Sequence, residues 1–236
     1  MEEYSLVCNS ITDLYEVHYA FVPWWMMAAS LGVSLLWALK KWLWDTKPTS
    51  QTKSVVILGR KASGKTTLWN RLRGYNFNKN YVITALDKIE QFTINRDDKQ
   101  VIIQATKDIG GDKKWVREYE ELIKERTFIL FLVDATDSCE DAQADIRARI
   151  QKILNIVNNN KLDNVGFRIY ITHSDEYLSR NPQTTYAMII EQIKKWLDLD
   201  SIKAPKKVKY EYYAVDLSCD KDIDTIKKEI IDSVYE

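Results

Sequence analysis

Four residues between positions 59 and 66 have the types and spacing of a phosphate-binding loop. They are Gly59, Gly64, Lys65 and Thr66, which fit the pattern G-x-x-x-x-G-K-[ST] directly after the apolar run SVVIL. In such a loop the backbone curls so that successive N–H groups point at phosphate oxygens, aided by the positive end of the following helix. The pattern predicts nucleotide binding, and the alternative is a glycine-rich turn without a nucleotide.

The side chains of this loop have separate predicted roles. Lys65 should reach the terminal phosphates of the nucleotide and serve catalysis there, and the Thr66 hydroxyl should ligate Mg²⁺. The other loop positions expected to contact phosphate are Lys61, Ala62, Ser63 and Thr67.

A second short pattern, D-x-x-G, follows a predicted strand further along the chain. Asp108 and Gly111 form it within the sequence KDIGGD. An acidic residue at a strand end can hold Mg²⁺ through water, and a nearby glycine amide can contact a γ-phosphate. Loss of that phosphate on hydrolysis would release the loop.

The sequence THSD at 172–175 favours guanine over adenine. The Asp175 carboxylate could accept hydrogen bonds from the ring N–H and the amino group of guanine, which adenine cannot supply. The alternative is a helix N-cap, which Ser174 or Asp175 could equally supply. The other residues expected at the base are Thr172, His173, Ser218 and Cys219.

Alternating strands and helices must position these residues. Apolar runs predict six strands, at 54–58, 88–94, 100–106, 127–135, 165–172 and 207–218. The second and third of these form a predicted hairpin around the turn-like NRDD. Helical patterns occupy 66–74, 140–159, 185–199 and 222–235. This alternation implies an α/β fold with a mostly parallel six-stranded sheet and helices on both faces.

The ordered set GRKASGKT, DIGG, THSD and LSCD resembles the Ras-like small GTPases over residues 54–236. Within that superfamily, DIGG and FLVDATDSCEDAQADI look most similar to the ADP-ribosylation factor branch. The resemblance implies the Ras-like P-loop NTPase fold, GTP or GDP with Mg²⁺ as cofactors, and GTP hydrolysis. It also implies switch loops near 78–87 and 109–118 that contact a cytoplasmic protein partner and a GTPase-activating or exchange protein.

By this resemblance, three residues near the switch loops bear on catalysis or partner binding. Thr84 is the candidate for the switch threonine that ligates Mg²⁺ and supports catalysis, and the alternative is an ordinary loop threonine. Asp112 stands where the family often has Gln to orient the attacking water, so intrinsic hydrolysis should be slow without a partner. Trp115 is either a partner anchor or a residue packed against the sheet.

Cationic positions also depart from or add to the family pattern. His173 replaces the usual Lys of the guanine motif, which lowers the expected nucleotide affinity. No arginine beside these motifs is an obvious finger on the γ-phosphate in cis, and the alternatives left open are Arg60 and Lys61, which lie within the phosphate loop.

Composition limits the class of protein. The chain has 236 residues, enough for one α/β domain and a short appendage, with 34 basic residues against 34 acidic ones. That balance argues against nucleic-acid binding, which usually shows a basic excess. Three cysteines without C-x-x-C spacing and two histidines make a zinc site an unfavourable interpretation.

An uncharged run of 21 residues precedes the predicted domain, from Tyr19 to Leu39. As a helix it would span about 31 Å, the thickness of a bilayer's hydrocarbon core. Tryptophans stand near both ends, and Lys40 and Lys41 follow, whereas residues 1–18 contain no Lys or Arg. Positive-inside reasoning places the N-terminus outside and the remaining chain in the cytoplasm. The alternatives are a cleaved signal peptide, which the acidic N-terminus disfavours, and a buried helix.

The expected organisation is an extracytoplasmic segment (1–18), a transmembrane helix (19–39), a juxtamembrane linker (40–53) and a GTPase domain (54–236). One membrane helix joined directly to such a domain is similar to the beta subunits of the signal recognition particle receptor. That similarity implies protein targeting at the endoplasmic reticulum in a eukaryote or at the inner membrane in a prokaryote. Three functions stay open: a slow GTPase switch that recruits a partner, a GTP-bound scaffold with little hydrolysis, and a P-loop ATPase or kinase.

Overall fold

A computed structural model describes most of the chain after the predicted membrane segment. The described residues are 40, 50–77, 86–124, 128–162, 165–199 and 208–235. The chain divides into two compact units, Met1–Lys47 and Pro48–Glu236, and the account below concerns the second. The predicted membrane helix at 19–39 lies outside the described residues. Among the helices that are described, none is both long enough and apolar enough to cross a bilayer.

Four parallel strands form the centre of the domain. They lie in the order β2, β7, β8, β9, and their bounds are Val55–Gly59, Phe128–Asp134, Gly166–Thr172 and Lys209–Ala214. Every residue of β2 is buried, as is every residue of β7 except the last. Continuous apolar runs of this kind suit a sheet that is covered on both faces. The predicted parallel α/β architecture is therefore confirmed.

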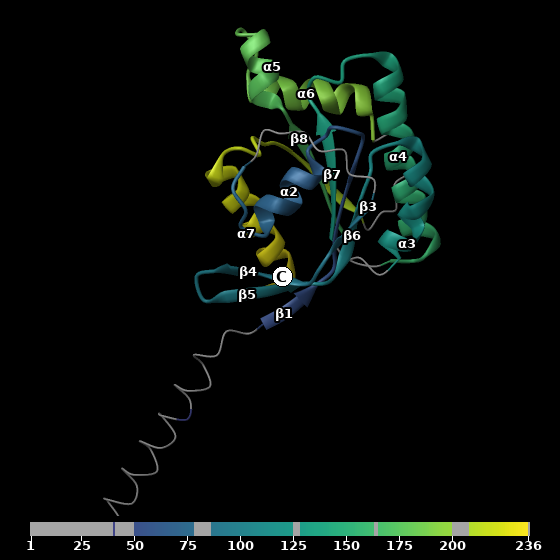
Figure 1. Cartoon of the computed structure of the whole chain (residues 1–236). Coiled ribbons are helices and arrows are strands. Elements are labelled where there is room, and N and C mark those ends of the chain that lie inside the picture. The colour runs from purple at the N-terminus through teal and green to yellow at the C-terminus, as the bar shows by residue number, and fades with distance from the viewer. Residues whose placement is uncertain are drawn as a thin grey trace, which may run out of the picture. The chain divides into compact units, whose positions relative to one another are not determined.

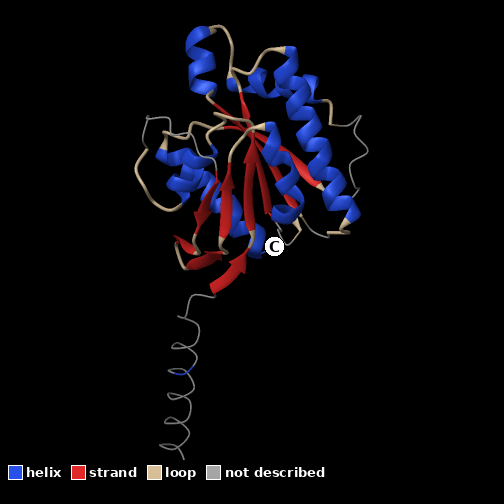
Figure 2. Ribbon diagram, turned by 45° about the vertical axis from the view of Figure 1, so that its right-hand side comes forward, coloured by secondary structure: helices blue, strands red, loops and turns tan. Residues whose placement is uncertain are grey.

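Helices cover both faces of this sheet (Figures 1 and 2). Alternate residues of each strand enter two separate hydrophobic cores, as Val56 and Val55 do. Helices α3, α4 and α6 contribute to the first core, and their bounds are Tyr119–Ile123, Glu140–Asn159 and Tyr186–Leu197. Helices α2 and α7 contribute to the second, and their bounds are Lys65–Leu72 and Asp220–Tyr235. The helix predicted at 140–159 is confirmed to the residue.

The predicted hairpin is present, but each of its strands is broken in two. The four pieces are β3 (Leu86–Ile89), β4 (Phe92–Arg96), β5 (Lys99–Ile103) and β6 (Thr106–Ile109). β3 pairs with β6 and β4 with β5, and the two breaks lie opposite each other between the Ile89–Thr106 and Phe92–Ile103 pairs. The prediction of a single six-stranded sheet is therefore wrong: the described residues form a four-stranded sheet, a three-stranded sheet and the two-stranded β3–β6 ladder.

The outer end of the hairpin breaks away because it pairs with another strand, β1 (Ser50–Lys53). β1 runs parallel to β5, so that the three-stranded sheet has the order β1, β5, β4. At the break, the Gln104 amide donates to the Lys53 carbonyl at 3.1 Å. The interpretation of 50–53 as linker is thus wrong, and the reason is that SQTK is polar and shows no apolar alternation.

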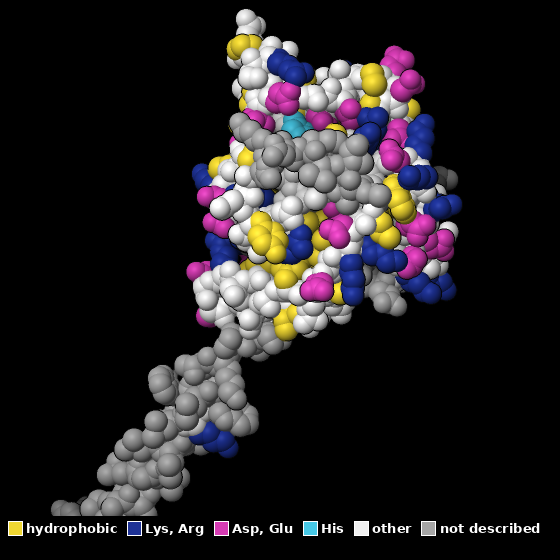
Figure 3. All heavy atoms as spheres, in the orientation of Figure 1, with side chains coloured by type: hydrophobic (Ala, Val, Ile, Leu, Met, Phe, Trp, Pro, Cys, Tyr) yellow, Lys and Arg dark blue, Asp and Glu magenta, His cyan; other side chains and the backbone are white. Residues whose placement is uncertain are grey.

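Three short helices, α5, η2 and α3, were not predicted. Helix α5 (Ser174–Arg180) follows β8, and a 3₁₀ helix, η2 (Lys113–Glu118), leads into α3. Each is too short to show a helical repeat in the sequence. Figure 3 shows basic and acidic side chains interspersed over one face of the domain, in keeping with its balanced composition.

Candidate nucleotide site

The motif residues meet at the carboxyl edge of the parallel sheet. β2, β7 and β8 end there at Gly59, Asp134 and Thr172. A pocket of about 570 Å³ opens at this edge. Its lining includes the predicted residues Lys61, Ala62, Gly64, Lys65, Thr66, Thr67, Gly111, Asp112, Thr172, His173, Asp175 and Ser218. Motifs far apart in the sequence therefore form one site, as ligand sites in such sheets usually do.

The loop between β2 and α2 has the backbone of an anion cradle. Gly64 precedes the first residue of α2 with a φ of 89°, which side-chain-bearing residues rarely adopt. Ala62 is also left-handed, with a φ of 64°. The Leu68 amide donates to the Gly64 carbonyl at 2.8 Å and so begins the helix. The N-terminus of such a helix carries partial positive charge and so favours an anion.

Lys65 is held almost entirely within the protein, with 7% of its surface exposed. Its Nζ donates to the Arg60 carbonyl at 2.7 Å. Burial lowers the pKa of Lys65 to about 8, with Asp108 opposing the shift and Arg149 adding to it. A partly desolvated ammonium beside the loop amides is suited to bind phosphate oxygens.

Thr66 and Asp108 form the metal-binding candidate. Thr66 Oγ1 donates to Asp108 Oδ2 at 2.5 Å, while Asp108 Oδ1 is buried and has no hydrogen-bond partner among the described residues. Burial raises the pKa of Asp108, and the Thr66 hydrogen bond and Lys65 oppose that shift. Hydroxyl and carboxylate oxygens are the donors that Mg²⁺ prefers when phosphates and waters complete its shell. The described residues contain no group of three or more His, Cys, Asp or Glu suited to a metal.

Gly111 touches the phosphate loop directly. A Cβ at this position would lie 1.9 Å from the Lys61 nitrogen, so only glycine permits this approach. Asp112 follows it and lines the pocket. Thr84, the predicted switch threonine, lies outside the described residues.

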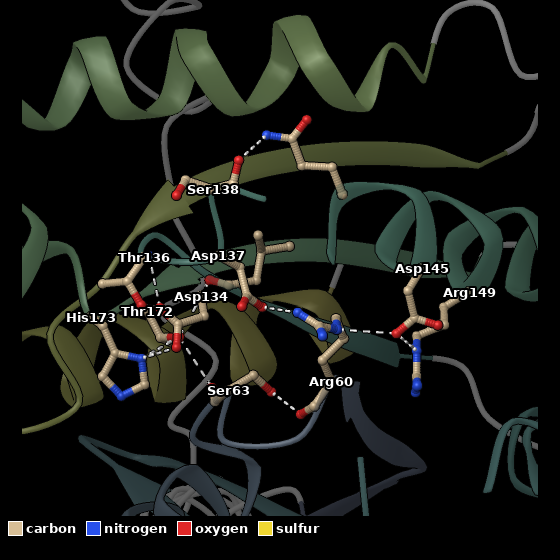
Figure 4. A network of polar contacts seen from close by, with 12 residues as sticks. Arg60, Ser63, Asp134, Thr136, Asp137, Ser138, Asp145, Arg149, Thr172 and His173 are labelled. Carbon is tan, nitrogen blue, oxygen red and sulfur yellow. Dashed lines mark hydrogen bonds and ion pairs between the residues drawn. The ribbon is translucent and has the colours of Figure 1, made fainter. Parts of the chain in front are cut away.

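Thr172 and His173 tie the end of β8 to the phosphate loop and to β7 (Figure 4). Thr172 Oγ1 lies 3.1 Å from the Ser63 carbonyl and 3.3 Å from the Val133 carbonyl. His173 Nδ1 lies 3.0 Å from Asp134 Oδ2. The hydrogen bond to Asp134 raises the pKa of His173 against the opposing effect of burial. Burial acts to raise the pKa of Asp134, but hydrogen bonds from His173 and Thr136 outweigh it and lower that pKa.

Asp175 does not serve as a helix cap. The N-cap of α5 is His173, without a side-chain capping bond, and Ser174 Oγ donates instead to the Ile171 carbonyl at 3.0 Å. Asp175 is exposed and lines the pocket. The N-cap alternative is therefore wrong for both residues.

Some predicted residues lie beside the pocket rather than on its wall. Gly59, Ser63 and Asp108 are buried and do not line it, and Cys219 is a partly buried free thiol next to the lining residue Ser218. Trp115 packs against the first hydrophobic core, which supports the packing alternative.

Sequence reasoning missed several residues of the wall. Asp134 lines it, and Asp216 lines it and accepts hydrogen bonds at Oδ1 from the amide and hydroxyl of Ser218, at 2.8 and 2.6 Å. Asp134 is the last residue of β7 and Asp216 lies just after β9, so their positions at strand ends were a usable signal. The other lining residues outside the motifs, for which the sequence shows no such signal, include Asn70, Arg71, Asn76 and Phe77.

Comparison with known families agrees with this geometry. No curated protein matched the chain. The family model that describes the ADP-ribosylation factor family matches residues 39–227, which include every motif that contributes to the pocket. The chain belongs to the ADP-ribosylation factor family.

Proposed function

We propose that this protein binds GTP and GDP with Mg²⁺ and acts as a slow, membrane-anchored switch that recruits a cytoplasmic partner. Members of the ADP-ribosylation factor family are GTPases that bind these nucleotides, typically with Mg²⁺. The observation that carries the proposal is the single pocket that joins the phosphate loop, the D-x-x-G segment and the THSD segment.

At the phosphate end, the loop amides of 61–67 and the Lys65 ammonium would hold the phosphates. Thr66 and the Asp108 carboxylate would hold Mg²⁺, directly or through water, and Thr84 would complete the set when GTP is bound. The buried Asp108 oxygen without a hydrogen-bond partner in the described chain supports this assignment.

At the base end, Asp175 would accept hydrogen bonds from guanine, while Thr172, His173, Ser218 and Cys219 would surround the ring. Support comes from the exposure of Asp175 to the pocket and from the absence of a capping role for it. An ATPase or kinase has no use for a carboxylate aimed at this edge of the base, which disfavours that alternative.

Hydrolysis is proposed to be slow because Asp112 occupies the place of the water-orienting residue. A carboxylate that lines the pocket near a γ-phosphate would repel it and reaches less far than Gln. A GTP-bound scaffold without turnover is the second candidate, and Asp112 is the feature that favours it.

Anchoring is proposed for 19–39, with residues 1–18 outside and the chain after Lys40 in the cytoplasm. Its support is the charge-free run of 21 residues followed by Lys40 and Lys41. Similarity of this arrangement to signal recognition particle receptor beta subunits makes protein targeting, at the endoplasmic reticulum or the bacterial inner membrane, the proposed setting.

Single-turnover GTP hydrolysis by the full chain in detergent or nanodiscs tests the switch. We expect a rate on the order of 10⁻⁴ s⁻¹ or lower without a partner, and a faster rate for Asp112→Gln. No turnover in either protein would favour the scaffold. Resistance of the full chain to alkaline extraction from membranes, and its loss when 19–39 are deleted, tests the anchor.

A further inference from the structure

A chain of polar side chains links the phosphate loop to the helix that follows the D-x-x-G segment. Arg60 Nε and Arg149 Nε both donate to Asp145 Oδ2, at 3.1 and 3.0 Å. Arg149 in turn donates from NH1 to the Tyr119 hydroxyl at 3.2 Å. We call Arg60, Asp145, Arg149 and Tyr119 the relay. Its members come from the phosphate loop, α4 and α3, and Figure 4 shows Arg60, Asp145 and Arg149 in line.

The inner part of the relay is deeply buried. Arg149 and Tyr119 are 2% and 1% exposed, and the Asp145 side chain is 12% exposed. A buried guanidinium must keep its carboxylate partner, because an unpaired charge in the interior is costly. Asp145 therefore has little freedom to leave Arg149, and Arg60 is held by the same oxygen.

Arg60 cannot serve as a finger on the γ-phosphate in this arrangement. Its NH1 contacts Asp137 Oδ2 at 2.5 Å and its Nε contacts Asp145, so its guanidinium is turned toward α4. Arg60 is also not among the residues that line the pocket. Its two carboxylate partners neutralise the charges of Arg60 and Arg149 together.

The backbone of Arg60 belongs to the phosphate site even though its side chain does not. Its carbonyl accepts from Lys65 Nζ at 2.7 Å and from Ser63 Oγ at 2.9 Å. Gly111 also packs on the Arg60–Lys61 backbone. Any shift of Arg60 would therefore move the groups that hold Lys65.

We propose that the relay is a positioning device, through which α3 and the switch segment before it set the placement of the phosphate loop and hence the rate of nucleotide release. The effect on nucleotide release rests on the proposed nucleotide binding. The mechanical link between α3 and the phosphate loop does not depend on it. Arg60 and Tyr119 are positioning residues, because neither lines the pocket.

The test uses the full chain and Tyr119→Phe, which removes a hydroxyl group and nothing else. Hydrogen exchange of the peptide that contains the phosphate loop should become about threefold faster or more, because the Tyr119 hydroxyl loses its contacts with Arg149 and with the backbone of Gly59. Release of fluorescently labelled GDP should change by a similar factor. Arg60→Gln should act likewise, and Arg60→Lys should restore part of the wild-type behaviour because it keeps the charge.

Tyr170→Phe is the matched control. Tyr170 is also 1% exposed and donates to Glu229 Oε2 at 2.8 Å, but Glu229 belongs to α7 on the opposite face of the sheet. The Tyr170→Phe substitution should lower the melting temperature without changing hydrogen exchange in the phosphate loop or the rate of GDP release. If both tyrosine variants behave alike, the relay has only a structural role and the proposal is wrong.

Double substitution gives an independent check. If Tyr119 and Arg60 act through the same relay, the double variant Tyr119→Phe, Arg60→Gln should change hydrogen exchange and GDP release no more than the stronger single variant does. A fold-change in the double variant equal to the product of the two single fold-changes would show that the residues act independently and would overturn the proposal. If phosphate-loop exchange responds as expected but the wild type binds no guanine nucleotide, the relay stands and the proposed function falls.

Discussion

Thr66 and Asp108 are joined by a hydrogen bond of 2.5 Å between Oγ1 and Oδ2, while the second carboxylate oxygen of Asp108 is buried without a hydrogen-bond partner in the described chain. Thr66 is the second residue of α2, the helix after the phosphate loop, and Asp108 lies in β6. An arrangement that leaves a buried carboxylate oxygen unsatisfied is expected where a cation completes the site.

Asp108→Asn should therefore weaken Mg²⁺ binding by about 10–100-fold, as loss of a group that orients or holds a metal commonly does. In the wild type, chelation of Mg²⁺ should accelerate GDP release, and in the variant it should have little further effect. Fluorescence of labelled GDP with and without chelator measures this. An unchanged response to chelation in Asp108→Asn would remove Asp108 from the metal site.

Asp175→Ala should reduce GTP affinity by about 100-fold or more while leaving any ATP affinity nearly unchanged, because only guanine offers two donors to this carboxylate. Calorimetric titration with each nucleotide measures both affinities. Glu191→Ala is a suitable control, since Glu191 lies on α6 in an exposed ion pair with Lys194. Equal losses for the two nucleotides would refute the guanine assignment.

Titration of Lys65 should make nucleotide affinity depend on pH in the alkaline range. Its pKa of about 8 in the free protein lies below the ordinary value of 10.5, so Lys65 loses its proton as the pH rises through 8. Phosphate would restore the charge, so GDP binding near pH 9 should take up close to one proton and weaken with rising pH. Calorimetry in buffers of different ionisation enthalpy detects the proton, and Lys65→Met should abolish the uptake. Uptake that persists in this variant would assign the titration to another group.

The lowered pKa of Lys65 also predicts how the free energy of unfolding changes with pH. The pKa of Lys65 is lower when folded than when unfolded, so between pH 8 and 10.5 the unfolded chain binds more protons. The contribution of Lys65 to the free energy of unfolding should therefore become more favourable as the pH rises through that window.

The contact between His173 and Asp134 predicts the opposite trend near neutral pH. The raised pKa of His173 means that its stabilising contribution is complete below the unfolded value of about 6.5 and is lost as the pH rises through the folded value. The lowered pKa of Asp134 means that its contribution is present above its unfolded value and is lost as the pH falls through the folded one. The ion pair is thus complete between those two folded pKa values.

Proton NMR can follow this directly, because the chain has only two histidines. His173 should titrate above 6.5, and Asp134→Asn should bring its pKa back down. A His173 pKa at or below 6.5 in the wild type would show that the contact is not an ion pair.

Sequence patterns predicted the central sheet and the main helices because burial imposes a repeat on them. The helix at Glu140–Asn159 places its buried residues on one face, and β7 is apolar from Phe128 to Val133. β1 could not be predicted, since its four polar residues owe their strand conformation to the edge of β5 rather than to a pattern. The broken hairpin follows from the same pairing.

The site shows a similar division. Lys65, Thr66 and Asp175 were predictable because their chemistry requires fixed types at fixed spacing. The relay was not, because Arg60, Asp145 and Tyr119 come from separate elements whose side chains meet only after folding.

Identification of the nucleotide that accompanies the purified full chain tests the central claim most directly. The protein would be isolated in mild detergent with Mg²⁺, denatured, and its released nucleotides separated and quantified. We predict close to one guanine nucleotide per chain, as GDP or GTP, and its loss in Lys65→Ala. Adenine nucleotide in its place, or a wild type that neither retains nor rebinds GDP, would contradict the account.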